Sequence, residues 1–469
     1  MAGGSSIHPT SAVPLSERRG PLTMGLLWVT MVTAFPLLLV GFEWYKEGLT
    51  FSQVLLGTTV SCLIILLYSI PATQLGARTG LSYTALSRSI FGRWGSRLVT
   101  INLIWMFTLF YGVTALLMAD AVNGLFHLNY SLAWMSVGFA IIMSFNNFFG
   151  FKGIANFARY VAAPLLIMWV AYTFWKATGS CPPDVLTEAP HKPFTTALTM
   201  ISTYVIGFAV WGNEKDYWRF SVPKPLQAAV PLAIALLIGQ IIFPTTGWMV
   251  AKITGITDYT AATSFMNNYS FGGIAWIGII VLGASYFAAN DSGMFGTIQA
   301  CESLKHLPHR TWVTIIAVIS ALTAFLLSIS GVAKSLDSIV SLNCVIMPTP
   351  TVVMLTEWFL LANVFKTSSI ENTRVPAFED LPIVRWPAFS ALLSGISVGL
   401  LTSGTIPGTG LFHIGVCSVQ AWLAAIVVYI PLRIREHKRL IAAQRTILER
   451  VLARRFEEAS ARIPVNAER

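Results

Sequence analysis

The stretch VLGASYFAANDSGMFG, residues 281–296, decides how the rest of the chain is interpreted. It lies within an apolar run, residues 272–300, that is long enough to cross a lipid bilayer as a helix. Because a carboxylate at membrane depth is costly unless it faces a cavity or a partner, Asp291 is a candidate functional residue. The alternative is that Asp291 lies near one end of a tilted helix and is solvated. The same stretch carries further polar side chains at Ser285, Tyr286, Asn290 and Ser292.

The composition of the whole chain indicates a membrane protein. Of its 469 residues, 55% are hydrophobic and 11% are charged, whereas soluble domains carry about 25% charged residues. The net charge of +10 comes from loops and the tail, without a basic module that has interleaved aromatic residues, so we expect no nucleic-acid partner. The five cysteines have no paired spacing and the seven histidines form no HExxH motif. We therefore expect no metal site, no cofactor and no enzyme activity.

Apolar runs of near-span length recur along the chain and predict an all-α polytopic membrane protein with twelve transmembrane helices. The predicted spans are residues 22–42, 51–75, 97–124, 131–149, 157–175, 197–213, 227–251, 272–300, 311–331, 337–361, 386–404 and 410–432. If both termini lie inside, only five of the 31 Lys and Arg residues fall in outside loops: Lys46, Lys176, Lys192, Lys252 and Lys334. Because cytoplasmic loops carry the excess of basic residues, both termini are expected in the cytoplasm, with the protein in a plasma or inner membrane.

We expect one transporter domain, residues 22–432, between a cytoplasmic N-terminal tail, residues 1–21, and a basic cytoplasmic tail, residues 433–469. Apolar residues recur at helical spacing in the basic tail, which predicts an amphipathic helix on the inner leaflet or against a partner. Residues 76–97 predict a short interfacial helix whose arginines contact anionic headgroups or lock a gate. Residues 254–270 predict a short outside helix.

Two spans carry signs of interruption. The first has Pro36 near its middle, where proline removes a helical donor. The sixth is short and has Gly207 and Gly212 on either side of Trp211. Interrupted segments at corresponding places in two halves point to a transporter site, whereas ordinary glycine packing in a tilted helix is the alternative for span six. The positions fit two inverted repeats of five helices followed by two extra helices, namely residues 22–175, 197–361 and 386–432.

Four segments together resemble the cytosine and purine permeases of the nucleobase–cation symporter family. They are VPLSERRG (13–20), GARTGLSYTALSRSIFG (76–92), DYWRF (216–220) and YFAANDSGMFG (286–296). The resemblance covers most of the chain and keeps the order of the segments. It implies a leucine-transporter-like fold, in which a bundle of spans 1, 2, 6 and 7 packs against a scaffold of spans 3, 4, 8 and 9, with the substrate at mid-membrane.

The resemblance also implies which residues bind the substrate. A flat heterocycle would lie between aromatic rings and be hydrogen-bonded by amide or hydroxyl groups. At two of these positions this chain differs from the cytosine permeases: it has Phe110 where they have a tryptophan and Ser285 where they have an asparagine. These differences weigh against cytosine itself as the substrate. The residues so assigned are Thr33, Phe35, Phe110, Tyr111, Gly207, Phe208, Ser285, Tyr286 and Asn290.

A further departure concerns the coupling ion. Sodium-dependent relatives use a hydroxyl-bearing pair in span eight together with carbonyls from the break in span one. The matching span-eight residues are Ala288 and Ala289, which offer no side-chain oxygen. We therefore favour proton coupling, with Asp291 as the proton carrier and Thr33 near the carbonyl end of the site, over sodium coupling or uncoupled transport.

The sequence thus predicts a secondary active importer of a nucleobase or related small heterocycle that works by alternating access. The ring could be a purine, a pyrimidine, a hydantoin or a vitamin precursor. Its partners are this small molecule and the lipid bilayer, and nothing in the sequence requires more than a monomer. An amino-acid or polyamine carrier of the same fold is the first alternative, although an unwound first helix that binds a carboxylate is usually marked by glycines. A polytopic membrane enzyme is the second alternative.

Overall fold

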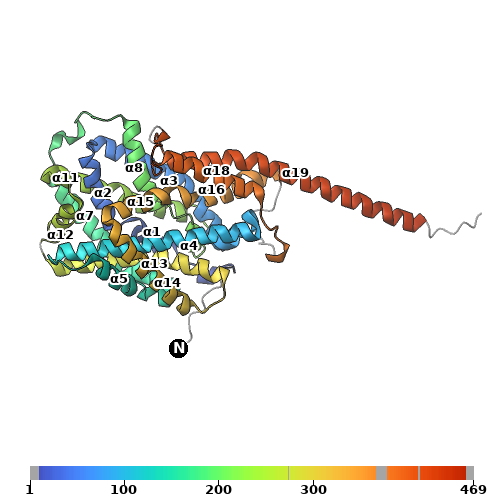
Figure 1. The fold of residues 1–469 in the computed structure, drawn as a ribbon, viewed down its shortest axis with the longest axis horizontal. Helices are drawn as coiled ribbons and strands as arrows, with labels where there is room; N and C mark the ends of the chain where they lie inside the picture. The colour runs from blue at the N-terminus through green and yellow to red at the C-terminus, as the bar shows by residue number, and fades with distance from the viewer. Residues whose placement is uncertain (1–9, 273, 366–377, 410–411, 461–469) are drawn as a thin grey trace, which may run out of the picture.

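A computed structural model describes residues 10–272, 274–365, 378–409 and 412–460 of the chain. Within these residues the regular elements are helices (Figure 1), and one isolated β-bridge pairs Arg19 with Ser221. The α-helices are α1 (Pro21–Val32), α2 (Phe35–Lys46), α3 (Phe51–Thr79), α4 (Tyr83–Leu125), α5 (Leu132–Met143), α6 (Gly150–Phe157), α7 (Ala163–Ser180), α8 (Phe194–Ala209), α9 (Glu214–Trp218), α10 (Leu226–Leu236), α11 (Phe243–Thr254), α12 (Tyr259–Phe271), α13 (Ala275–Leu304), α14 (His309–Ser330), α15 (Val332–Ile346), α16 (Pro348–Leu355), α17 (Ala362–Phe365), α18 (Trp386–Thr402) and α19 (Cys417–Ser460). Short 3₁₀ or π segments are η1 (Leu15–Glu17), η2 (Phe145–Phe149), η3 (Ala158–Ala162), η4 (Pro183–Leu186), η5 (Leu237–Ile242), η6 (Thr356–Leu361) and η8 (Phe378–Asp380).

The described helices confirm a polytopic membrane protein. Among the described residues, eight helices are long and apolar enough to cross a membrane, or up to ten if each of two bent pairs counts as one span. One of the eight, Leu132–Ser180, contains both the fourth and the fifth expected span, and Gly150 with its φ of 62° interrupts it. The apolar helix α18 is shorter. The arrangement is consistent with twelve spans.

The segment that joins the second and third spans folds as its sequence indicates. Helix α3 ends at Thr79 and is capped by Gly80, whose φ of 69° suits glycine. Ser82 then caps the start of α4 by accepting a hydrogen bond from the backbone N–H of Ala85. Gly92 has non-helical backbone angles, so it separates a short first part of α4, residues 83–91, from the span that follows. The expected short helix after span two is therefore confirmed.

The spans pack in the two groups that the family resemblance implies. Within the first group, α1 packs on α10, α2 on α11, and α3 on α8 and α9. Within the second group, α4 packs on α5, α13 and α14, and α5 also packs on α14. The first group is the expected bundle and the second is the expected scaffold.

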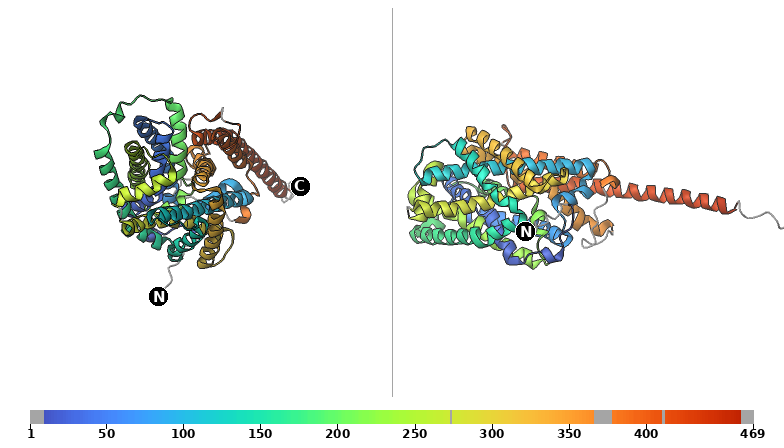
Figure 2. Two further views of the ribbon diagram at one scale, coloured as in Figure 1. Left: turned by 60° about the vertical axis from the view of Figure 1, so that its left-hand side comes forward. Right: turned by 90° about the horizontal axis from the view of Figure 1, so that it is seen from below.

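The last two long helices, α18 and α19, lie side by side against this core (Figures 1 and 2). Glu357 of η6 holds α19, because its carboxylate lies 2.9 Å from the Arg433 guanidinium and accepts a hydrogen bond from the Tyr429 hydroxyl. Beyond Arg433 the helix continues to Ser460 and projects away from the other helices (Figure 1). The helix expected in the basic tail is thus the continuation of α19, and its contact with a leaflet stays a prediction.

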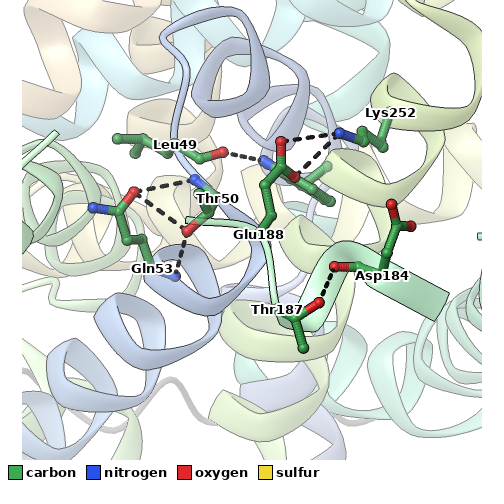
Figure 3. Close-up of polar contacts among 8 residues, drawn as sticks. Leu49, Thr50, Gln53, Asp184, Thr187, Glu188 and Lys252 are labelled. Carbon is green, nitrogen blue, oxygen red and sulfur yellow. Dashed lines mark hydrogen bonds and ion pairs between the residues drawn. The ribbon is translucent and has the colours of Figure 1, made fainter. Parts of the chain in front are cut away.

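We call the end of the molecule from which α19 projects the basic end, and the end that carries η4 and α12 the far end. At the far end, the loop around η4 is fastened to the start of α3 and the end of α11. Gln53 donates to the Lys192 carbonyl at 2.6 Å. Lys252 forms an ion pair of 3.1 Å with Glu188, as Figure 3 shows. The connector between the two expected repeats is therefore held across the far end.

Candidate functional site

The first span is broken where Pro36 predicts it. Helix α1 ends at Val32, Thr33 and Ala34 are extended, and α2 begins at Phe35 with a bend of 47° between the two helices. Pro36 stands in the first turn of α2, where its missing N–H has no helical acceptor to lose. The break therefore exposes backbone carbonyl groups in the middle of the protein.

The seventh span covers this break. Gln240 of the π-helical segment η5 donates from its side-chain amide to the Val32 carbonyl at 2.7 Å. Its neighbour Gly239 lies so close that an added Cβ would be 2.4 Å from that carbonyl oxygen. Glutamine therefore supplies the donor that a broken helix needs at membrane depth. The Thr33 hydroxyl is buried beside it without a hydrogen-bond partner among the described residues.

The sixth span is broken as well, at residues 210–213 between α8 and α9. The Glu214 carboxylate accepts hydrogen bonds from the backbone N–H groups of Trp211 and Gly212, at 2.9 and 3.0 Å, and from the Tyr68 hydroxyl at 3.0 Å. On the other side of the break, Asn343 of α15 donates to the Gly207 carbonyl at 2.6 Å. The predicted interruption is confirmed, and helix α8 ends four residues earlier than the expected span.

Four charged residues follow this break and are fully enclosed: Glu214, Lys215, Asp216 and Arg219. They carry two charges of each sign, so the cluster is neutral overall. Lys215 donates to the Thr351 hydroxyl at 2.7 Å, and Asp216 accepts from the Tyr83 backbone N–H at 2.7 Å. The cluster therefore joins the sixth span to the tenth span and to the start of α4. The sequence reasoning missed it, although four charges beside an apolar segment were a usable signal.

The N-terminal segment, residues 10–20, packs across the same end of the molecule. Arg19 donates its backbone N–H to the Phe220 carbonyl at 2.6 Å, and Arg18 donates to the carbonyls of Ala77 and Ser221. These contacts hold the ends of the second and sixth spans together. Burial lowers the pKa of the Arg18 guanidinium from its usual range. The basic end is thus closed by two layers, the enclosed charges and the N-terminal segment.

Aromatic rings from the third and sixth spans meet beside the second break. Phe110 lies 5.4 Å from Trp211 and 6.4 Å from Phe208 between ring centroids, and Phe107 lies 5.4 Å from Trp211. The structure therefore brings together Phe110 and Phe208, as the family resemblance implies. Both side chains are buried, and the Trp211 indole N–H has no partner among the described residues.

Other predicted residues are engaged in packing between helices. Phe35 stacks on Trp169 of α7 at 5.7 Å, and the Tyr111 hydroxyl donates to the Ala140 carbonyl of α5 at 2.8 Å. An added Cβ at Gly207 would lie 2.5 Å from the Val340 side chain, so this glycine allows α8 to approach α15. These three residues therefore support the walls of the site: the side chains of Phe35 and Tyr111 face neighbouring helices, and Gly207 allows close packing of the backbone.

Two polar residues of the eighth span, Asn290 and Asp291, contact the third and fourth spans. Asp291 is fully buried and accepts hydrogen bonds from the side-chain amides of Asn146, at 2.8 Å, and Asn147, at 3.2 Å. Asn290 donates to the Tyr111 carbonyl at 3.4 Å. The Asp291 carboxylate is therefore held by the 3₁₀ segment η2, a partnership that the sequence reasoning did not anticipate.

A second polar pair adjoins Asp291. His309 approaches the Asn147 carbonyl with Nε2 at 2.8 Å and the Glu302 carboxylate with Nδ1 at 2.7 Å. Both neighbours are acceptors, so the arrangement suits an imidazole that carries both protons. Asp291 is in this way connected through Asn147 to an acid–histidine pair that is nearer the basic end.

The remaining residues of the eighth span differ in their surroundings. The Ser285 hydroxyl is buried without a hydrogen-bond partner among the described residues. Tyr286 is buried too. Ala288 packs against Ala162 of η3 and Ala284, so no side-chain oxygen is present at this contact.

No group of three or more His, Cys, Asp or Glu residues that could hold a metal ion occurs in the described part of the chain.

The far end is hollow. A cavity of about 800 Å³ opens between α2, α8 and α15 and the loops beside them. Four carboxylates line it, together with Lys46 and His413: Glu43, Glu47, Asp258 and Asp337. Because carboxylates predominate, the cavity favours neutral or cationic solutes over anions. One end of the molecule is thus open and acidic, and the other is closed.

Comparisons with known proteins agree with this architecture. No protein-family model matches the chain. Cytosine permeases of Escherichia coli strains K12 and O157:H7 are 24% identical to it over 403 residues, which cover 84% of this chain and 89% of each permease. The solved structure of Mhp1, a nucleobase-cation-symport-1 family transporter with bromovinylhydantoin bound, matches with a TM-score of 0.68 at 19% identity, covering 92% of this chain and 96% of Mhp1. A Na⁺-coupled sialic acid symporter matches with a TM-score of 0.60 at 12% identity, covering 89% of this chain and 90% of the symporter.

Proposed function

Because the chain belongs to the nucleobase–cation symporter family as a cytosine-permease-like secondary transporter, we propose that it imports a nucleobase or a related small heterocycle by alternating access. The meeting of Phe110 and Phe208 with Trp211 beside the break in span six carries this proposal. Two broken spans at mid-membrane provide the flexible backbone that transporter sites use, and the rings provide the apolar faces that a flat solute needs.

The site residues divide by role. Phe110 and Phe208 stack on the substrate, and the unpartnered hydroxyls of Ser285 and Thr33 bind its polar edge. A buried hydroxyl without a partner is costly, so a ligand that supplies the missing hydrogen bond gains affinity there. Tyr286 and Asn290 complete the wall from the eighth span, whereas Phe35, Tyr111 and Gly207 position it.

We place the acidic cavity outside the cell and the basic end in the cytoplasm of a plasma or inner membrane. The cavity at the far end then faces the outside, and the enclosed charges seal the basic end. Phe110, Phe208 and Ser285 are buried and do not line this cavity. To test the orientation, Cys181 is first replaced by serine, since it is the cysteine with partial exposure. Ser338→Cys, in the cavity wall, should then react with a membrane-impermeant maleimide in intact cells. Lys305→Cys, at the basic end, should react only after permeabilisation; the reverse pattern would contradict the orientation.

Proton coupling through Asp291 is the favoured coupling mode. Ala288 offers no side-chain oxygen, so a span-eight ligand that sodium-dependent relatives use is missing, and the Val32 carbonyl at the break of span one accepts a hydrogen bond from the Gln240 amide. The Asn146 and Asn147 amides suit the ionised carboxylate as donors, and an amide that flips presents its oxygen to the protonated form. Sodium coupling is the alternative.

Uptake in proteoliposomes tests the function directly. Radiolabelled purines, pyrimidines, hydantoins and vitamin-like rings are offered under an inward proton gradient, an inward sodium gradient or neither. Saturable uptake of one ring that follows the proton gradient is the expected result. The acidic cavity favours one rival, a polyamine carrier of the same fold, so putrescine and an amino-acid mixture complete the panel. If an amine is taken up and none of the ring compounds is, the protein is a polyamine carrier and the nucleobase assignment is wrong.

A further inference from the structure

A second cavity, of about 430 Å³, lies at the basic end. Its walls come from α4 on both sides of the break at Gly92, from the end of α13 with the loop that follows it, and from η8. Arg88, Arg97 and His306 line it together with hydroxyl-bearing residues, and Glu379 is the carboxylate among the lining residues. The lining thus carries more positive than negative charge, in contrast to the acidic cavity at the far end.

The two arginines are held close together by one aromatic ring. The guanidinium of Arg88 lies 5.4 Å and that of Arg97 lies 5.1 Å from the centroid of the Phe378 ring. Arg97 also lies 5.0 Å from the Trp94 ring. Cation–π contacts fix the planes of the guanidinium groups and leave their N–H edges available. Among the described residues neither arginine is within 4.0 Å of a carboxylate oxygen.

The walls of this cavity are fixed by backbone hydrogen bonds. Arg93 and Trp94 donate their backbone N–H groups to the carbonyls of Pro382 and Ile383, both at 2.9 Å. Gly92 makes this contact possible, because an added Cβ there would lie 2.5 Å from the Pro382 carbonyl oxygen. Arg88 in turn donates to the Ser303 carbonyl at 3.3 Å. The segment after η8 and the end of α13 are therefore both tied to the start of α4, and the cavity is a built feature.

Its position is at the expected membrane surface. The short helix 83–91 follows the second span, and Trp94 beside it is 56% exposed. Tryptophan is enriched at the headgroup level of membranes. A basic pocket between transmembrane helices at this level is suited to phosphorylated headgroups.

We propose that this cavity binds a phosphate-bearing anion through Arg88 and Arg97. Two guanidinium groups that share one ring repel each other unless an anion lies between them, and the planar fork of arginine matches phosphate oxygens. The phosphate belongs either to the headgroup of an anionic phospholipid or to a soluble phosphate compound. The inference does not depend on the identity of the transported substrate.

Binding to the delipidated full-length protein tests the proposal. Native mass spectrometry is performed with phosphatidylglycerol, phosphatidic acid and phosphatidylcholine, and thermal unfolding is followed with inorganic phosphate and with chloride at equal ionic strength. Arg88→Gln/Arg97→Gln removes the two pocket charges. Arg435→Gln/Arg439→Gln removes two exposed charges of α19 on the same end and is the matched control.

We expect the pocket variant to lose affinity for the phosphate-bearing ligand at least about tenfold, as the loss of a charged hydrogen bond implies, and the α19 variant to keep it. Retention of anionic lipids identifies a headgroup, whereas stabilisation by inorganic phosphate alone identifies a soluble anion. Arg88→Lys/Arg97→Lys should recover part of the binding and shows that the pocket still folds. If neither ligand class binds, or if both glutamine variants weaken binding equally, the proposal is wrong.

Discussion

Asn146 donates a hydrogen bond of 2.8 Å to the buried carboxylate of Asp291, across the boundary between η2 and α13. Asn147 donates to the other carboxylate oxygen at 3.2 Å. A buried charge needs such partners or must be neutralised by a proton. This pair of amides therefore places Asp291 in a setting where gaining or losing a proton changes its contacts with the fourth span, which is what a coupling residue requires.

Asp291→Asn should abolish the response of uptake to proton gradients. The amide cannot take up a proton, while its size allows it to keep contacts with Asn146 and Asn147. We expect the rise of uptake towards acid pH to disappear, with ligand binding in thermal-shift assays retained. Initial uptake rates across the acid-to-neutral range measure this. Asp337→Asn, in the wall of the far-end cavity, is the control and should keep the response; an Asp291→Asn transporter with the unaltered pH profile would exclude Asp291 as the proton carrier.

Removal of either stacking ring should weaken substrate binding without unfolding the protein. Base–aromatic stacking contributes about 1–3 kcal/mol per ring, which corresponds to about 5- to 150-fold in affinity. Phe110→Ala and Phe208→Ala should each raise the dissociation constant within this range in titrations of the purified protein. The ring of Phe145 is 63% exposed on the outside of the helices, so Phe145→Ala should leave affinity unchanged. Equal effects of all three substitutions would indicate a general loss of stability.

The sequence was sufficient for the order of the spans and for both helix breaks. Pro36 and Gly212 act through the backbone, because one lacks an N–H and the other has a φ of 76°, and such local effects can be recognised without tertiary structure. The bundle and scaffold also follow from the family resemblance. These features together predicted the fold, and the position of the candidate site at mid-membrane stays a prediction.

The directions of side chains could not be predicted in the same way. A membrane helix is apolar on all sides, so hydrophobic periodicity does not show which residues face a neighbour. Two residues that were assigned to the substrate therefore contact neighbouring helices instead. The Tyr111 hydroxyl donates a hydrogen bond to α5, and the Phe35 ring stacks on Trp169 of α7. The partners of Asp291 were missed for a related reason: the 3₁₀ segment η2 changes the rotation of the fourth span at Asn146 and Asn147.

Gly212→Ala should destabilise the protein strongly. Gly212 has a φ of 76°, and an added Cβ would lie 2.2 Å from the Met347 carbonyl oxygen, a backbone atom that cannot move aside alone. Backbone strain of this kind costs about 1–3 kcal/mol before the clash is counted. We expect a lower melting temperature and a lower yield in the membrane. Gly138→Ala, where an added Cβ meets nothing within 4 Å, should melt at or above the temperature of the unmodified protein; similar melting of the two variants would contradict the role of Gly212.

Substitutions of Glu214 should loosen the closed end in a defined order. The carboxylate holds two backbone N–H groups of the break and the Tyr68 hydroxyl. Tyr68→Phe removes one hydrogen bond. Glu214→Gln keeps an acceptor for the backbone groups but loses the charge, and hydrogen bonds to charged groups contribute about 1.5–3 kcal/mol against about 0.5–1.5 kcal/mol for neutral ones. Glu214→Ala leaves the backbone donors unpaired and disturbs the charge balance with Lys215 and Arg219.

The melting temperature should therefore fall least for Tyr68→Phe, more for Glu214→Gln and most for Glu214→Ala. Glu47→Gln is the control, because Glu47 makes an ion pair of 2.9 Å with Lys192 in which both side chains are more than a third exposed, and such pairs contribute little. If the enclosed charges seal the basic end, the same order should appear in the maleimide reactivity of a cysteine introduced at Ser221, which is buried in the closed arrangement. Glu214→Ala with unaltered melting and unaltered reactivity would show that this cluster does not hold the end closed.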